Sequence, residues 1–207
     1  MKKMVEYSEK KDKTKNQLEE PSTNYTYDDY LNFEFDHLVE LIHGKIFPMT
    51  PAPGTTHQKT SLKLTLLIAP YFEKSACHFF SAPTDVILPI GKSQQRDTVV
   101  QPDHFVVCDP LKIQESGCFG APDWVIEILS AHNKKKDLRD KYDAYELAEI
   151  GEYWIVFPQE KIVEIFILQE GKYRRGGAFT EDDIISPTRF PDLRCDLSYI
   201  FDLSKDV

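Results

Sequence analysis

Three acidic residues lie in or beside apolar runs, where an ionised side chain is unusual. Glu127 stands within 121–130, a run of large and β-branched residues that predicts a strand buried on both faces. Asp103 directly precedes the apolar run 105–108, and Glu40 lies in the apolar segment 37–42. A buried carboxylate must be paired, metal-bound or protonated, because leaving it bare costs several kcal/mol. The three acids are therefore candidates for one site.

Strand alternation indicates how two of these acids can meet. It places Asp103 on the face of Phe105, and Glu127 on the face of Val125 and Leu129. If the two strands are neighbours, the Asp103 and Glu127 carboxylates converge at one edge of the sheet. Two converging carboxylates suit a hard divalent cation such as Mg²⁺ or Mn²⁺. A cation held there can activate water for attack on a phosphodiester and stabilise the leaving oxygen.

A cationic side chain is expected beside such a centre, where it can position water or neutralise the transition state. Lys141 is the best candidate in the predicted helix 133–149. It shares an arc of that helix with Leu138, three residues before it, and Tyr145, four residues after it. We therefore predict that Lys141 orients the nucleophilic water.

Each candidate also has a structural explanation. Glu127 could be a structural acid paired with a buried lysine or arginine. Asp103 follows a proline and could be a turn residue. Glu40 could be an exposed cross-strand partner of Lys45, and the ammonium of Lys141 could reach solvent from a packed stem.

The elements that position these residues follow from apolar periodicity. Helices are predicted from Thr26 onward (a short one), over 57–75 and 133–149, and near 197–201. A hairpin is predicted around His43-Gly44, and further strands over 78–88, 98–100, 105–108, 121–130, 152–157 and 162–168, with a last hairpin at 170–173 and a loop between 108 and 121. This order predicts an α/β domain with a mixed, curved β-sheet flanked by helices. Residues 1–22 are expected to form a flexible arm, and 23–207 a single domain.

Composition limits the possible environments and partners. The net charge of −9 over 207 residues argues against nonspecific coating of nucleic acid, although a basic groove beside an acidic metal site stays possible. The four cysteines are scattered without a C-x-x-C pair, which predicts reduced thiols in a cytoplasmic protein. The N-terminus lacks the apolar run of a signal peptide, and the longest apolar stretch, 62–72, is too short to span a bilayer.

Six stretches together resemble a known family: VELIHGKI at 39–46, THQ at 56–58, VQPD at 100–103, GAPDWVIEILS at 120–130, DLRDK at 137–141 and EYWIV at 152–156. In this order they are similar to the Uma-two family of restriction endonucleases, within the PD-(D/E)XK nuclease superfamily. The resemblance implies a restriction-endonuclease-like core and a Mg²⁺-dependent nuclease site.

Carried over residue by residue, the resemblance implies that Asp103 and Glu127 are the two metal-binding acids and that Glu40 is the early acid that joins them. The usual pattern of the superfamily has a lysine two places after the second acid, where this chain has Leu129. Lys141 would then be a lysine that has moved to the next helix.

Two further residues, His57 and Gln101, are expected beside the metal ligands without binding the metal themselves. His57 follows two threonines at the predicted start of a helix, from where its ring could contact a phosphate or a metal ligand.

The predicted function is hydrolysis of DNA phosphodiester bonds with Mg²⁺ or Mn²⁺, by a homodimer whose two-fold symmetry matches that of the duplex. Two other functions stay open. One is an inactive nuclease fold used as a DNA-binding or interaction module, and the other is hydrolysis of a smaller phosphoester, suggested by the acidic net charge. The recognised DNA sequence is not predicted, because the chain has no familiar base-reading motif.

Overall fold

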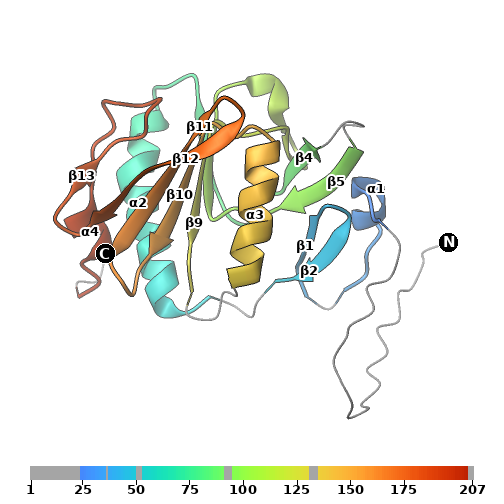
Figure 1. Cartoon of the computed structure of the whole chain (residues 1–207), viewed down its shortest axis with the longest axis horizontal. Coiled ribbons are helices and arrows are strands. Elements are labelled where there is room, and N and C mark those ends of the chain that lie inside the picture. The colour runs from blue at the N-terminus through green and yellow to red at the C-terminus, as the bar shows by residue number, and fades with distance from the viewer. Residues whose placement is uncertain (1–23, 36, 50–52, 91–94, 131–134, 205–207) are drawn as a thin grey trace, which may run out of the picture.

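The computed structural model describes residues 24–35, 37–49, 53–90, 95–130 and 135–204. In these residues the strands form two six-stranded sheets and a two-stranded one, and helices cover both faces of the second sheet (Figure 1). The predicted α/β class, with a mixed sheet flanked by helices, is confirmed. The arm predicted over 1–22 lies outside the described residues.

The first sheet has the strand order β2-β1-β5-β4-β8-β7. Its strands are β1 (Val39–Ile42), β2 (Lys45–Pro48), β4 (Val86–Ile90), β5 (Gln95–Val100), β7 (Ile113–Gln114) and β8 (Gly117–Phe119). The predicted hairpin joins β1 to β2, and both of its turn residues have positive φ, 51° at His43 and 72° at Gly44. Such angles match the twist of the flanking strands, which is why a glycine is useful there.

The second sheet has the strand order β12-β11-β10-β9-β6-β3. Its strands are β3 (His78–Ser81), β6 (His104–Val107), β9 (Trp124–Ile128), β10 (Glu152–Phe157), β11 (Ile162–Gln169) and β12 (Lys172–Thr180). Strand β9 runs parallel to β10 and antiparallel to β6. All five residues of β9 are buried, as its apolar composition predicts.

Helices α2 (Thr55–Phe72) and α3 (Lys135–Leu147) cover opposite faces of the second sheet, α2 behind it and α3 in front in Figure 1. Trp124 and Ile126 pack toward α2, whereas Val125, between them in the chain, packs toward α3 and the first sheet. Alternation along β9 therefore decides which side chains reach α3.

The remaining elements are short. They are α1 (Tyr27–Tyr30), the 3₁₀ turn η1 (Pro110–Lys112), the strand pair β13 (Ile184–Ile185) and β14 (Cys195–Asp196), and α4 (Leu197–Phe201). Helix α1 begins with a capping box between Thr26 and Asp29, at the predicted start of the short helix. Helix α4 has the predicted bounds, and its apolar side chains join the core beside α2.

The prediction of one strand over 78–88 is wrong. The segment forms β3 and β4, which belong to different sheets. Pro83 lies between them and cannot donate to a strand ladder, so the chain leaves one sheet there and enters the other. The loop predicted between 108 and 121 also contains structure, because η1, β7 and β8 lie within it and β8 pairs with β4.

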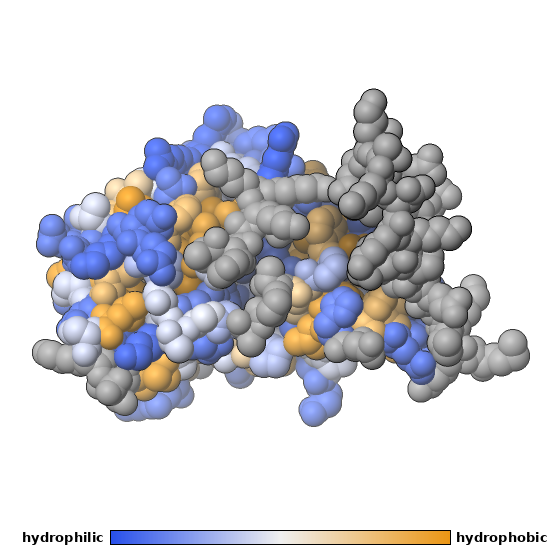
Figure 2. Space-filling view, turned by 90° about the horizontal axis from the view of Figure 1, so that it is seen from below, coloured by the Kyte–Doolittle hydropathy of each residue, from blue (hydrophilic) through white to orange (hydrophobic). Residues whose placement is uncertain are grey.

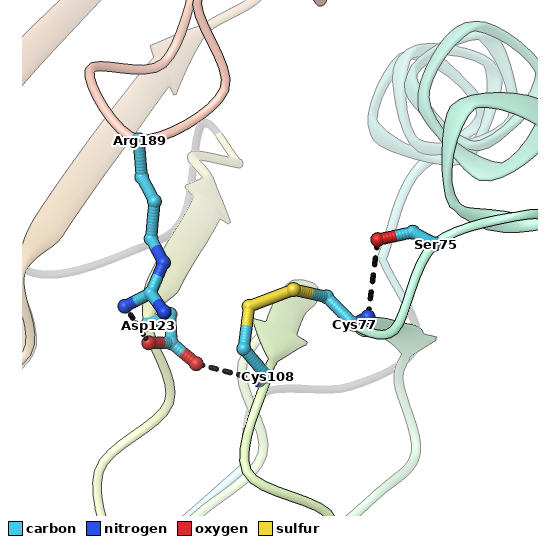
Figure 3. Close-up of a disulfide and its surroundings, with 5 residues drawn as sticks. All are labelled: Ser75, Cys77, Cys108, Asp123 and Arg189. Atoms are coloured by element: carbon cyan, nitrogen blue, oxygen red, sulfur yellow. Dashed lines mark hydrogen bonds and ion pairs between the residues drawn. A yellow bond between two sulfur atoms is a disulfide. The ribbon is translucent and has the colours of Figure 1, made fainter.

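The prediction that all cysteines are reduced is wrong for two of them. Cys77 and Cys108 form a disulfide, shown with its surroundings in Figure 3. Strands β3 and β6 pair with His78 opposite Val107, so the next step of the ladder brings the two cysteines face to face. The backbone N–H of Cys108 donates to Asp123 Oδ2 at 2.6 Å, and the other oxygen of Asp123 pairs with Arg189. Cys118 and Cys195 are free thiols, as predicted, and both are buried.

Within the described residues, none of the helices combines the length and the apolar character that crossing a membrane would require. The coloured part of the face in Figure 2 shows hydrophobic patches separated by hydrophilic residues. The described part of this face therefore presents no continuous apolar surface.

Candidate active site

The predicted site residues line a single pocket of about 140 Å³ between the two sheets. They come from β1 (Glu40), the first turn of α2 (His57), the β5–β6 connection (Gln101 and Asp103), β9 (Glu127) and α3 (Lys141). A larger hollow of about 490 Å³ lies beside α4 and contains none of them. The structure thus brings together all of the residues to which the sequence assigned a role.

The two strand-borne acids are neighbours. Strands β6 and β9 pair with His104 opposite Ile126, so one further step brings Asp103 beside Glu127. Asp103 Oδ2 accepts a hydrogen bond from the backbone N–H of Ile128 at 2.7 Å. The predicted adjacency of the two strands is confirmed, and the Asp103 carboxylate ties them together instead of capping a turn.

Lys141 lies between acids from both sheets. Its Nζ is 2.9 Å from Glu127 Oε1 and 2.8 Å from Glu40 Oε1. The three side chains are only 10–14% exposed, so the ammonium does not reach solvent. Glu40 is not an exposed partner of Lys45, since Ile42 stands opposite Lys45 in the hairpin. The contact between Glu127 and Lys141 fits both explanations of Glu127: a structural pair with a buried lysine, and a functional site.

His57 and Gln101 hold two of the acids in place. His57 Nε2 lies 3.2 Å from Asp103 Oδ1. The backbone N–H of Gln101 donates to Glu40 Oε1 at 2.8 Å, while its side-chain amide donates to Asp85 Oδ1 at 2.7 Å. Both residues contact the predicted metal ligands, as expected from the sequence.

Sequence reasoning missed two tyrosines of the site. The Tyr145 hydroxyl donates to Glu127 Oε1 at 2.6 Å, and Tyr153 lines the same pocket. For Tyr145, the available signal was its place on the helical arc that singled out Lys141. For Tyr153, the available signal was its alternation in a strand beside the one that carries Glu127.

Charge and burial set the protonation of the cluster. Burial raises the pKa of Glu127 to about 7; Lys141 opposes that rise, and the Asp103 and Glu40 carboxylates add to it. Burial alone would lower the pKa of Lys141, but Glu127 and Glu40 outweigh it and raise that pKa. Burial likewise opposes ionisation of Asp103, yet the hydrogen bond and charge of His57 lower its pKa. Two carboxylates share the Lys141 ammonium while Asp103 pairs with His57, and Glu127 is the acid that retains a proton most readily.

The donor set suits a hard divalent cation. No three acidic, histidine or cysteine side chains in the described ranges surround one point in a geometry that would hold a metal. Mg²⁺, however, commonly uses one or two carboxylates together with several waters, and Asp103 and Glu127 form such a pair. Lys141 pairs with Glu40 and Glu127, and His57 pairs with Asp103, so with all five groups charged the cluster keeps one negative charge. This excess of negative charge attracts a cation.

Comparison with known proteins identifies a matching family and a similar fold. A model of the Uma2 (Uma-two) family, described as "Putative restriction endonuclease", matches residues 26–198, which include every residue of the pocket. The chain is also similar to the crystal structure of "a putative nuclease belonging to DUF820 from Anabaena variabilis ATCC 29413", with a TM-score of 0.68 and 21% identity over 85% of this chain and 97% of that one. This likeness shows a shared fold. Curated proteins give no match.

Proposed function

The chain belongs to the Uma2 family, and from this membership and the geometry of the pocket we propose that it hydrolyses DNA phosphodiester bonds with Mg²⁺ or Mn²⁺. One observation carries the proposal. Asp103 and Glu127, carboxylates from neighbouring strands, share a single pocket with the buried ammonium of Lys141. A simple structural ion pair needs two partners, whereas here Lys141 contacts two acids, Glu40 and Glu127, and a third acid, Asp103, lies in the same pocket.

Asp103 and Glu127 are the residues that would hold the metal, with Glu40 as the assisting acid. When bound, the ion supplies Lewis-acid charge that activates water and stabilises the leaving oxygen. Asp103 is prepared for this role, because its lowered pKa keeps it ionised. Glu127 must release the proton that burial favours, so ion binding and proton loss are coupled at this residue.

Lys141 acts as a donor. Its raised pKa keeps the amine protonated, so it holds its proton instead of accepting one from water. A fixed ammonium can orient an attacking water through hydrogen bonds, and it can offset the negative charge that develops on the phosphoryl oxygens. His57 keeps the Asp103 carboxylate oriented through the contact at 3.2 Å. We further infer a homodimer, because two-fold symmetry would place one such pocket at each strand of a duplex.

The test is cleavage of supercoiled plasmid with Mg²⁺ or Mn²⁺, compared with the same reaction in EDTA. We expect metal-dependent nicking by the wild type, and a loss of about two orders of magnitude in D103N and E127Q, the scale of removing one group that stabilises charge. D143N is the matched control, because Asp143 is an exposed acid of α3 outside the pocket.

Each outcome of this test decides between functions. Absence of metal-dependent nicking by the wild type would favour the inactive DNA-binding or interaction module. Nicking retained in D103N would show that the cutting occurs elsewhere. Inhibition by nucleotides but not by excess duplex would instead indicate a smaller phosphoester as the substrate.

A further inference from the structure

Tyr153 lines the pocket and carries a hydroxyl group to which the proposed reaction gives no role. Tyr153 stands opposite Val125 in the parallel pairing of β10 with β9, so its side chain shares the face of Val125 and Glu127. The residue is 0% exposed and lines the pocket together with Asp103 and Lys141. Its ring packs edge-on against Tyr145, with the centroids 5.1 Å apart.

The hydroxyl of Tyr153 has no hydrogen-bond partner among the described residues. Buried polar groups are almost always paired, and one that is not needs an explanation. Its neighbour Tyr145 follows the rule, since its hydroxyl donates to Glu127 Oε1 at 2.6 Å. The two tyrosines therefore differ in one respect: the Tyr145 hydroxyl supports a carboxylate, whereas the Tyr153 hydroxyl, on a side chain that lines the pocket, is left without a partner among the described residues.

The surroundings determine what this hydroxyl can do. Burial, and then the charges of Glu127, Tyr173, Asp103 and Glu40, raise the pKa of Tyr153 well above its usual value. The hydroxyl therefore keeps its proton at any physiological pH, and it can donate a hydrogen bond but cannot serve as a base or nucleophile. A ligand that carries only acceptor atoms is the natural partner for such a group, and the non-bridging oxygens of a phosphodiester are acceptors only.

We propose that Tyr153 is a further catalytic residue, whose hydroxyl donates a hydrogen bond to a non-bridging oxygen of the phosphodiester bound in this pocket. The proposal rests on the proposed function, since it presumes a phosphodiester as the ligand. No proton is transferred: the O–H bond stays intact and the hydrogen bond strengthens as negative charge grows on the phosphoryl oxygens. Tyr153 thereby supplies a neutral donor in addition to the Lys141 ammonium, in a pocket that also holds three acids.

The test is Y153F, with Y173F as its matched control. Tyr173 also has a buried hydroxyl without a partner among the described residues, and its ring centroid is 6.1 Å from that of Tyr153, but it does not line the pocket. Both substitutions delete the same atom from the same core. We expect Y153F to lower kcat/KM for DNA cleavage by about 10- to 100-fold, the range for one hydrogen bond to a charged group. Y173F should match the wild type.

Stability separates this role from a structural one. Neither variant removes a hydrogen bond within the protein, so the melting temperature of both should equal or exceed that of the wild type. A Y153F protein that melts like the wild type and cleaves within twofold of it would overturn the proposal. So would an equal loss of cleavage in Y173F.

Binding of a short fluorescein-labelled duplex, measured by anisotropy with Ca²⁺, separates this proposal from the proposed function. If the wild type binds duplex without cleaving it, and Y153F binds at least tenfold more weakly while Y173F does not, then Tyr153 contacts the phosphate and only hydrolysis is refuted. If the wild type cleaves and Y153F is unchanged in binding and cleavage, only the role of Tyr153 fails. A wild type that neither binds nor cleaves DNA refutes both.

Discussion

Replacing Lys141 by methionine is expected to destabilise the protein in EDTA and to make its stability depend on divalent metal. Methionine keeps most of the apolar stem and removes the ammonium, which lies 2.8 Å from Glu40 and 2.9 Å from Glu127. Both carboxylates would then remain in the pocket without their cation. Breaking a buried ion pair in this way costs about 3–5 kcal/mol.

Protonation of Glu127 limits the loss. The pKa of this acid is already raised to about 7, and Lys141 is the group that opposes a larger rise. Without Lys141, Glu127 stays neutral to a higher pH, so the penalty should be smaller at pH 6 than at pH 8. For a chain of this size, about 3–5 kcal/mol corresponds to a fall in melting temperature of roughly 6–20 °C.

Divalent metal should restore more stability to K141M than it adds to the wild type. In the wild type, the ammonium already occupies Glu40 and Glu127 oxygens that a metal would use. At a free metal concentration about 100 times the dissociation constant, binding adds about 2.7 kcal/mol. Thermal unfolding at pH 8, in EDTA and with Mn²⁺, measures both effects.

K172M is the control for this experiment. Lys172 also pairs with a glutamate, Glu146, at 2.7 Å, but its side chain is 66% exposed. Exposed ion pairs add little to stability, so K172M should melt close to the wild type and gain no extra response to metal. If K141M behaves like K172M, or if Mn²⁺ raises its melting temperature no more than that of the wild type, then the ammonium is not the cation of this cluster.

Three further predictions concern the disulfide, a buried acid and the place of the lysine. The double variant C77S/C108S should lose about 3–4 kcal/mol in urea unfolding, because the bond closes a loop with a sequence separation of 31; a wild-type midpoint unaffected by dithiothreitol would contradict this. Burial raises the pKa of Glu152, which favours the native state at low pH, and this contribution is lost as the pH rises through the raised pKa. The wild type should therefore lose stability relative to E152Q above the ordinary glutamate pKa of about 4.5, and parallel pH profiles would be inconsistent with a raised pKa. Finally, Leu129 lines the pocket, so L129K added to K141M should recover part of the lost melting temperature, whereas no recovery would mean that position 129 points elsewhere.

Local sequence pattern was sufficient to predict the residues of the site whose positions depend on a single strand or helix. Alternation indicated how Asp103 and Glu127 could converge if their strands were neighbours. The helical arc of Leu138 and Tyr145 selected Lys141 from its neighbours. These inferences need only the periods of strand and helix, and the structure confirms the resulting geometry. The roles of these residues in catalysis stay predictions.

Features that depend on contacts between distant segments could not be predicted. Glu40 reaches Lys141 because the hairpin of the first sheet packs beside α3, and no local pattern distinguishes that from an exposed position on the hairpin. The disulfide depends on the register between β3 and β6, which brings Cys77 opposite Cys108 across 31 positions of sequence. The chain passes from one sheet to the other between β3 and β4, and Pro83 is the local sign of that break.

The departure from the superfamily pattern at Leu129 has a geometric explanation. A lysine at that position would project from the second sheet, on the face that carries Glu127. Lys141 instead approaches from α3, which packs against both sheets, so one ammonium contacts Glu127 of the second sheet and Glu40 of the first. The proposed reaction needs a cation within hydrogen-bonding distance of these acids, and a helix facing the strand ends can supply it as well as the strand itself. Spatial position therefore defines this lysine better than its distance along the chain from the second acid.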